Sequence, residues 1–517
     1  MKSSEEMPIS MTAGKGKVEL IADRFMPRLL RPFWERVQAS SVGYRLAHGA
    51  FWSFAGTLVS RVLTLLSSIV VARMLGKDAF GELGIVQSTI AMFQAFAGFG
   101  LGLTATKHVA EFKIADPERA GRVLALSSAV AIVTGITATL CMYIFSPWLA
   151  TKTLASPGLA NLLRLSSTML FLGALNGAQT GALAGFEAFK HMSKVNLLSG
   201  IATFLFMVVG VVVWGLTGTV CGLILSMVAN CLLNYRALIH EAKKFGVPMH
   251  YSGCLCEWRG LWKFSLLATM SGLVVTPITW ASNAIVVNQP GGYGELGVYN
   301  AVLKLKQVPE TLLATVMNPI LPMLSEQFAN KDTAGYGKTL SVAYVMSCLI
   351  MVPTSIFAMY FPNLMLLPYG SSYAGYGLLV QWLFLHGIMV GLFSPLSSVL
   401  ASTNTMWIGF VYNFAYSAFF ISFALLFVPK FLGAGLAMSL CFASLIPSVL
   451  CVAYIYYNHK SFMGNFSLIK YSTIFISFGL VSIYFREILA NQSAHIVGLI
   501  LTVASFLLLG RRLLKSG

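Results

Sequence analysis

Charged residues are scarce in this sequence, and acidic residues are scarcer than basic ones. Only 10% of the 517 residues are charged, with 18 Asp and Glu against 35 Lys and Arg, whereas 57% are apolar. So little charge excludes an ordinary soluble globular protein and is typical of a chain that lies largely in a membrane. The formal net charge of +17 would suit a nucleic-acid partner, but the placement of the basic residues argues against one.

Common catalytic signatures are also missing. The sequence contains no P-loop, no GxSxG and no HExxH, and no apolar run holds a pair of carboxylates. A glycosyltransferase would need a sizeable soluble domain or acidic metal ligands, and neither is visible. We therefore expect a protein that is not an enzyme, with no catalytic residue and no cofactor.

The eight cysteines give no sign of a metal centre. Most lie in apolar runs, where Cys acts as a small hydrophobic residue. Cys254 and Cys256 share a predicted cytosolic loop, but no second pair and no nearby His cluster completes a zinc site. We expect no metal site.

The apolar residues form fourteen runs, each long enough to cross a hydrocarbon core of about 30 Å as a helix. The runs begin near Ala50, Leu83, Val123, Leu162, Val195, Thr217, Phe264, Val298, Leu340, Leu378, Met406, Leu432, Ser467 and Ala494. No cleavable signal peptide is visible, because the first run follows a long polar tail. With the N-terminus inside, about 26 of the 35 Lys and Arg fall on the cytosolic side and about five outside. This bias predicts a multi-pass protein with both termini in the cytosol and with anionic lipid as a surface partner.

A pattern in the stretch from Ala50 to Gly84 returns about two hundred residues later. Trp52-Ser53-Phe54 is echoed by Trp262-Lys263-Phe264, and Gly81-Glu82-Leu83-Gly84 by Gly294-Glu295-Leu296-Gly297. The offsets are 210 residues from Trp52 to Trp262 and 213 from Gly81 to Gly294. Such similar offsets indicate a duplicated half, and duplicated membrane halves are typical of transporters, with the substrate path between them.

The duplication divides the chain into five predicted parts. They are a cytosolic tail (1–47), an N-lobe of six spans (48–239), a cytosolic linker loop (240–263), a C-lobe of six spans (264–458) and a final pair of spans with a cytosolic C-terminus (459–517). The predicted fold class is therefore an all-α integral membrane protein of about 14 helices. It has two duplicated six-helix lobes and two extra C-terminal helices.

Arg61 is the most unusual charge in the first half. It lies about eleven residues from either end of span one, which at about 1.5 Å per residue is near the membrane midplane. A charge there is costly unless it faces a watery cavity or a partner. We favour a cavity cation; the alternative is a structural Arg bonded to carbonyls of a neighbouring helix. Lys107, at the cytosolic mouth, is a candidate first contact for an anionic substrate, although its loop also suits a solvated surface.

Span eight carries Lys304 and Lys306, followed by Glu310. Two positions on a helix correspond to about 200°, so the two lysines face different ways. Lys306 and Glu310 are four positions apart and are expected to neutralise each other. Lys304 is then the better cavity cation and Lys306 a second candidate. The alternative is that both lysines reach outward to the membrane interface.

His386 and Pro277 complete the candidate residues. A His inside span ten can relay protons, so His386 and Glu310 are candidate coupling residues, although a hydrogen-bonded core His is the commoner finding. Pro277 removes a backbone hydrogen bond in span seven and is a candidate hinge, although membrane helices often tolerate Pro without function.

The sign of these charges bears on the cargo. A drug or sodium antiporter is expected to hold its cation with an Asp or Glu deep in the bundle. Here the only clear intramembrane acid is Glu310, beside two lysines. A cationic lining favours an anionic cargo.

A pattern of short segments covers the membrane region. It consists of Arg73-Met74-Leu75-Gly76 with Phe80-Gly81, Asp116-Pro117, Gly185-Phe186-Glu187, Gly297-Val298-Tyr299-Asn300, Pro319-Ile320-Leu321-Pro322 and Tyr369-Gly370. This pattern resembles that of bacterial polysaccharide-unit flippases of the multidrug/oligosaccharidyl-lipid/polysaccharide (MOP) exporter superfamily.

The resemblance implies two six-helix lobes around a central cavity that opens alternately to each side. It implies a cargo of undecaprenyl-pyrophosphate-linked oligosaccharide, moved from the inner to the outer leaflet of the bacterial cytoplasmic membrane. The product would be O-antigen, capsule or exopolysaccharide, with polymerase and export machinery as further partners. Fourteen-helix members such as the lipid II flippases border a lipid-tail groove with the last pair, and spans thirteen and fourteen could do the same. Only Arg61 and Lys304 fall in places similar to the cavity cations of those relatives, so another glycan is favoured over lipid II.

Two other functions stay open. A cation-coupled multidrug antiporter of the same superfamily predicts uptake changes for cationic dyes and dependence on an intramembrane acid. A non-transporting scaffold for a glycan-synthesis complex predicts loss of function without any change in leaflet distribution.

Overall fold

The computed structural model describes residues 41–98, 100–248, 253–403 and 405–463, which form helices joined by short turns. These residues contain no strand, so the all-α prediction is confirmed for them. The segment 1–40 and the predicted last pair of spans, after residue 463, lie outside the described residues. The total of about 14 spans therefore stays a prediction.

The helices follow the predicted spans in order. The N-terminal half contains α3 (Ser41–Gly98), α4 (Leu101–Ala115), α5 (Pro117–Trp148), α6 (Leu159–Ser166), α7 (Thr168–Gly185) and α8 (Phe189–Lys244). The C-terminal half contains α9 (Trp258–Val287), α10 (Gly292–Met317), α11 (Ile320–Ala329), α12 (Thr333–Tyr360), α13 (Pro362–Leu366), α14 (Gly377–Ser402) and α15 (Met406–Met463). Six of them, α3, α5, α8, α12, α14 and α15, are long and apolar enough to cross a membrane.

Three of these six helices fold back on themselves between two predicted spans. In α3 the backbone leaves the helical region at Gly76, with a φ of 76°, and in α8 it does so at Trp214 and Gly215. In α15, Leu432 has a φ of 51°. Gly adopts a positive φ without steric cost, so Gly76 and Gly215 suit these turns. The end of the molecule that holds the three turns was predicted to be extracytoplasmic and is called the outer end below; the opposite end is the inner end.

Each half also contains a helix that breaks before it reaches the inner end. The second arm of α3 is separated from α4 by Gly100, which has a left-handed φ of 62°. Beyond the second Gly-Glu-Leu-Gly segment, α10 ends and α11 begins across Asn318 and Pro319. The matching breaks extend the sequence duplication to the level of helix geometry.

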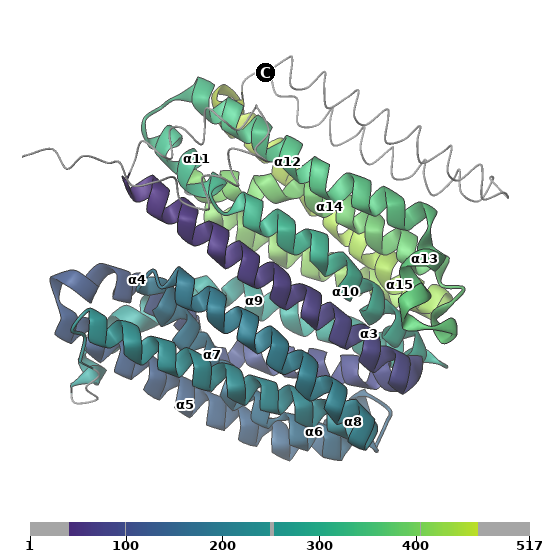
Figure 1. Ribbon diagram of the computed structural model, residues 1–517. Coiled ribbons are helices and arrows are strands. Elements are labelled where there is room, and N and C mark those ends of the chain that lie inside the picture. Colours follow the sequence, from purple (N-terminus) through teal and green to yellow (C-terminus); the bar gives the residue numbers. More distant parts are fainter. Residues whose placement is uncertain (1–40, 99, 249–252, 404, 464–517) are drawn as a thin grey trace, which may run out of the picture.

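The two halves form two groups of helices that meet along α3, α9 and α10 (Figure 1). In the N-terminal half, α5, α7 and α8 pack on one another, and in the C-terminal half α12, α14 and α15 do so. Between the groups, α10 packs along α3, and α9 contacts both α3 and α15. The boundaries predicted for the lobes, 48–239 and 264–458, stay predictions.

The hydrophobic cores differ between the two ends. One large core at the outer end includes residues of both halves, among them Leu83, Val298 and Tyr369. Toward the inner end the core divides. One cluster, with Val109 and Phe186 among its members, belongs to the N-terminal half, and another, built around residues such as Leu324, belongs to the C-terminal half. The halves therefore share one hydrophobic core at the outer end and have separate hydrophobic cores at the inner end.

Candidate functional site

The two copies of the Gly-Glu-Leu-Gly segment contact each other at the outer end. A Cβ atom placed on Gly81 would overlap the carbonyl oxygen of Tyr293, and one placed on Gly297 would overlap the carbonyl oxygen of Lys77. Gly84 likewise packs against the side chain of Asn300. Only glycine allows the second arm of α3 and the start of α10 to approach so closely.

Polar contacts between the halves strengthen this outer junction. The Lys77 ammonium donates to the Tyr376 hydroxyl at 2.9 Å, and the Tyr373 hydroxyl donates to the Ala72 carbonyl at 3.2 Å. A little deeper, the Trp280 indole nitrogen donates to the Thr89 hydroxyl at 2.9 Å. Each bond joins α3 to an element of the C-terminal half. The outer end is closed by packing and by hydrogen bonds.

Arg61 lies on the first arm of α3 and is exposed. The neighbouring Ser60 packs against Gly200 of α8, and Arg61 is rotated by about 100° from it around the helix. Among the described residues, Arg61 has no hydrogen bond or ion pair. The expected alternative, an Arg bonded to carbonyls of a neighbouring helix, finds no support among those residues.

Lys304 lies on α10, in the opposite half of the molecule, and is partly buried. Arg61 and Lys304 are close enough for their positive charges to repel each other. No acid among the described residues forms an ion pair with Lys304. Two cations from the two halves thus lie within range of mutual repulsion, and neither forms an ion pair with a described residue.

Lys306 differs from Lys304 although only one residue separates them. Its side chain is 4% exposed, and its ammonium lies 2.7 Å from His386 Nδ1 and 3.1 Å from Glu310 Oε1. The ion pair expected from the spacing of Lys306 and Glu310 is confirmed. His386, on α14, is the partner that the sequence did not indicate. These three side chains form a closed polar cluster inside the C-terminal half.

The other two candidates lie apart from this cluster. Lys107 is exposed on α4, near the inner end. Pro277 lies within α9, which has no non-helical residue at this position, so its role as a hinge stays a prediction. The surface hollow lined by Trp280, Asn288 and neighbouring residues is at the outer end and contains none of the candidate residues.

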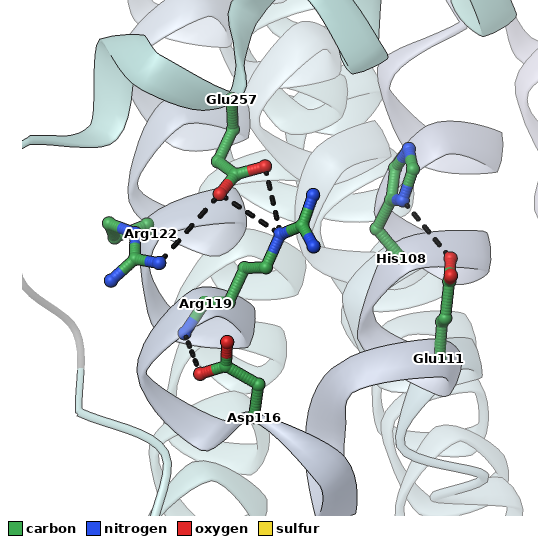
Figure 2. Close-up of polar contacts among 6 residues, drawn as sticks. All are labelled: His108, Glu111, Asp116, Arg119, Arg122 and Glu257. Atoms are coloured by element: carbon green, nitrogen blue, oxygen red, sulfur yellow. Dashed lines mark hydrogen bonds and ion pairs between the residues drawn. The ribbon is translucent and has the colours of Figure 1, made fainter.

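A contact that sequence reasoning missed fixes the linker to the N-terminal half. Glu257, directly before α9, receives the Arg119 Nε–H at 3.1 Å and lies 3.8 Å from Arg122 Nη2 (Figure 2). Asp116 caps α5 by accepting from the Arg119 backbone N–H, which orients this first turn. Because α9 begins one residue after Glu257, the start of α9 is held at the inner end of α5. From the sequence, the mixed charges of the loop that holds Arg119 and Arg122 indicated only a solvated surface. The fold identifies Glu257 as the partner of these two arginines.

Comparison with known families gives one match. Residues 46–328 match the model of a family described as polysaccharide biosynthesis protein. This range begins near the start of α3 and ends in α11. It includes both Gly-Glu-Leu-Gly segments, Arg61 and Lys304. Among curated protein sequences, none matches the chain significantly.

Solved structures show what this fold is similar to. An inward-facing multidrug resistance transporter of the MATE family, in the MOP superfamily, matches with a TM-score of 0.70 and 14% identity, over 81% of this chain and 100% of that chain. The lipid II flippase MurJ in an inward closed conformation matches with a TM-score of 0.68 and 14% identity, over 88% and 97%. An outward-facing MATE transporter gives a lower TM-score, 0.61, at 13% identity over 81% and 96%.

Proposed function

Because the chain belongs to the polysaccharide biosynthesis protein family, we propose that it flips lipid-linked oligosaccharide across a bacterial cytoplasmic membrane. The cargo would be an undecaprenyl-pyrophosphate-linked unit that passes from the inner to the outer leaflet. The oligosaccharide would then enter O-antigen, capsule or exopolysaccharide synthesis, with polymerase and export machinery as partners. The proposed location is the inner membrane, with both termini in the cytosol.

The observation that supports this proposal is the pair Arg61 and Lys304, two cations that repel each other and form no ion pair with any described residue. Two like charges held close together in a membrane region are unfavourable unless an anion binds between them. A pyrophosphate supplies several negative oxygen atoms in a small volume, and guanidinium and ammonium groups both bind such oxygen atoms through charge-assisted hydrogen bonds. The two cations come from opposite halves, so a bound pyrophosphate would contact both halves at once.

The mechanism follows from the cost of moving charge through hydrocarbon. Pyrophosphate and sugars cannot cross the apolar core alone, because buried charge without partners is prohibitive. In the proposed cycle, the headgroup enters from the inner end, past Lys107, and binds Arg61 and Lys304 while the prenyl tail stays in lipid. The halves then close at the inner end and separate at the outer junction, with Pro277 as the candidate hinge of α9. Glu310 and His386 are the candidates for coupling this cycle to an ion gradient.

The test is the leaflet distribution of lipid-linked oligosaccharide. Cells depleted of the protein would be converted to spheroplasts and exposed to an impermeant glycan-modifying enzyme. We expect the lipid-linked units to accumulate in a protected inner pool, and wild-type protein but not Arg61→Ala to restore their exposure. Normal exposure in depleted cells would contradict the flippase function for that glycan. Loss of polysaccharide with a normal leaflet distribution would instead indicate a scaffold for glycan synthesis.

The alternative is a cation-coupled multidrug antiporter, which the fold similarity to MATE transporters favours. An antiporter needs an acid that is free to bind a cation. Glu310 is the candidate acid in those predicted spans that the structure describes, and it already forms an ion pair with Lys306. If depletion changed the accumulation of cationic dyes and Glu310→Gln had the same effect, the antiporter would replace the flippase.

A further inference from the structure

We propose that His191, His240 and Glu241 form a binding site for a divalent transition metal such as Zn²⁺ at the inner end of α8. The candidate ligand atoms of these three residues all lie within 4.8 Å of one another. No other group of three or more His, Cys, Asp or Glu side chains among the described residues has this proximity. The inference does not depend on the proposed function.

The hairpin shape of α8 assembles the site. His191 lies near the start of the first arm, and His240 and Glu241 lie near the end of the second arm. The turn at Gly215 returns the chain to its starting level, so residues about fifty positions apart become neighbours. The two imidazole rings are 5.1 Å apart between centroids, at an interplanar angle of 60°.

The residues differ in burial in a way that suits metal binding. The Glu241 side chain is only 4% exposed, and its Oε1 lies 2.7 Å from His191 Nδ1. A carboxylate this buried needs a fixed cationic or hydrogen-bonding partner. His240 is exposed, so a metal ion can reach the site from solvent, whereas His191 is 33% exposed and lies between the two environments.

The donor set matches the chemistry of zinc. Imidazole nitrogen and carboxylate oxygen are both common zinc ligands, and two imidazoles with one carboxylate leave a fourth position for water. Lys244 now lies 3.5 Å from Glu241 Oε2 and shares the carboxylate charge. Because the Lys244 side chain is 62% exposed, it can move into solvent when a metal binds. A bound ion would join the two ends of the α8 hairpin.

The chain offers a matched control for this site. His108 and Glu111 also form a His–Glu contact near the inner end, with Nδ1 and Oε2 3.5 Å apart (Figure 2). These two residues lie on one helix, α4, and no third ligand of the His, Cys, Asp or Glu type completes a group there among the described residues. Two ligands on one helical turn bind zinc more weakly than three from two arms.

The experiment is a titration of the purified full-length protein in detergent with Zn²⁺ in competition with a chromogenic chelator. Wild-type protein should bind one equivalent, and the bound ion should raise the melting temperature. His240→Ala should weaken binding by roughly tenfold or more, since even outer partners of metal ligands contribute about that much. Because His240 is exposed, this variant should fold normally, and His108→Ala should bind like the wild type.

Three outcomes would overturn the proposal. The first is no stoichiometric binding by the wild type, which would make the cluster an ion pair only. The second is equal binding by wild type and His240→Ala, which would place the ion elsewhere, and a Cys254→Ser, Cys256→Ser double variant would then locate it. The third is an equal loss in His108→Ala and His240→Ala, which would indicate weak surface binding. Substitution of His191 by Ala provides the second independent variant, with the same expected loss.

Discussion

Lys304 and Lys306 lie on the same helix, one residue apart, and their surroundings are opposite. Lys306 is buried and contacts His386 and Glu310, whereas Lys304 is within range of electrostatic repulsion by Arg61. The positive charge of Lys306 is compensated by the Glu310 carboxylate. Lys304 has no ion pair with any described residue, and the positive charge of Arg61 acts on it.

This difference separates two roles for intramembrane charge. A compensated cation contributes to the structure, and removal of one partner leaves the others buried and unpaired. An uncompensated cation raises the electrostatic energy of the protein without cargo, and this energy falls when an anion binds to it. Variants at the two sites should therefore fail in different ways, one in transport and the other in folding.

The largest effect is expected for Arg61→Ala. Flipping should fall to the level of cells without the protein, because the cation predicted to lie near the membrane midplane and to bind the pyrophosphate is lost. Stability should change by no more than about 0.5 kcal/mol, since Arg61 is exposed and bonded to no described residue. The leaflet assay measures the first quantity, and the melting temperature of purified protein measures the second. Arg164→Ala serves as the control, because Arg164 lies over the Tyr143 ring, away from this pair; normal flipping by a well-expressed Arg61→Ala would remove Arg61 from the site.

Lys306→Ala should lower the stability of the protein rather than its binding of cargo. It leaves the Glu310 carboxylate and the buried His386 without their shared partner, which typically costs about 3–5 kcal/mol for a buried charge pair. We expect a lower melting temperature and less protein in the membrane, with transport reduced in proportion. If the variant were stable but inactive, Lys306 would join the cargo-binding cations and the distinction from Lys304 would fail.

Lys304→Ala should give a smaller loss of transport than Arg61→Ala. One charge-assisted hydrogen bond to phosphate contributes about 1.5–3 kcal/mol, so the flipping rate should fall roughly 10- to 100-fold while some Arg61-dependent activity remains. Loss of the repulsion with Arg61 should leave stability unchanged or slightly higher. A marked decrease in stability would show that Lys304 has a structural partner.

The smallest effect is expected for Glu310→Gln. Lys306 keeps its contact with His386 and can still donate to the amide oxygen, but its buried charge loses its counter-ion, so the loss in stability should be about 1–3 kcal/mol. Flipping should continue at nearly the normal rate. If flipping stopped in a stable Glu310→Gln protein, the carboxylate would be the coupling residue and the cluster would not be purely structural.

The local features of this fold were predictable from the sequence. The spacing of Lys306 and Glu310 predicted their ion pair, and the helix period predicted that Lys304 would face another way. The turns also lie between the apolar runs that the hydropathy defines, and the first turn is at Gly76. These features depend on residues within a few positions of one another.

The long-range contacts were not predictable. His386 is 80 residues from Lys306, and Glu257 is 138 residues from Arg119; both pairs exist only because separate helices pack together. The proximity of His191 to Glu241 was likewise not predictable, because it depends on how the two arms of α8 pack together. A single sequence specifies which helices form, but it contains little information on which face of each helix meets which neighbour.

The outer junction has a consequence for the history of the chain. A segment that packs against its own copy makes the kind of contact found in a two-fold symmetric dimer, where one surface serves both subunits. If the halves were once separate, identical chains, every substitution at this surface would have changed the contact twice. Fusion into one chain would have removed that restriction. The glycines could then remain fixed on both sides while Arg61 and Lys304 arose at unrelated positions of the two halves.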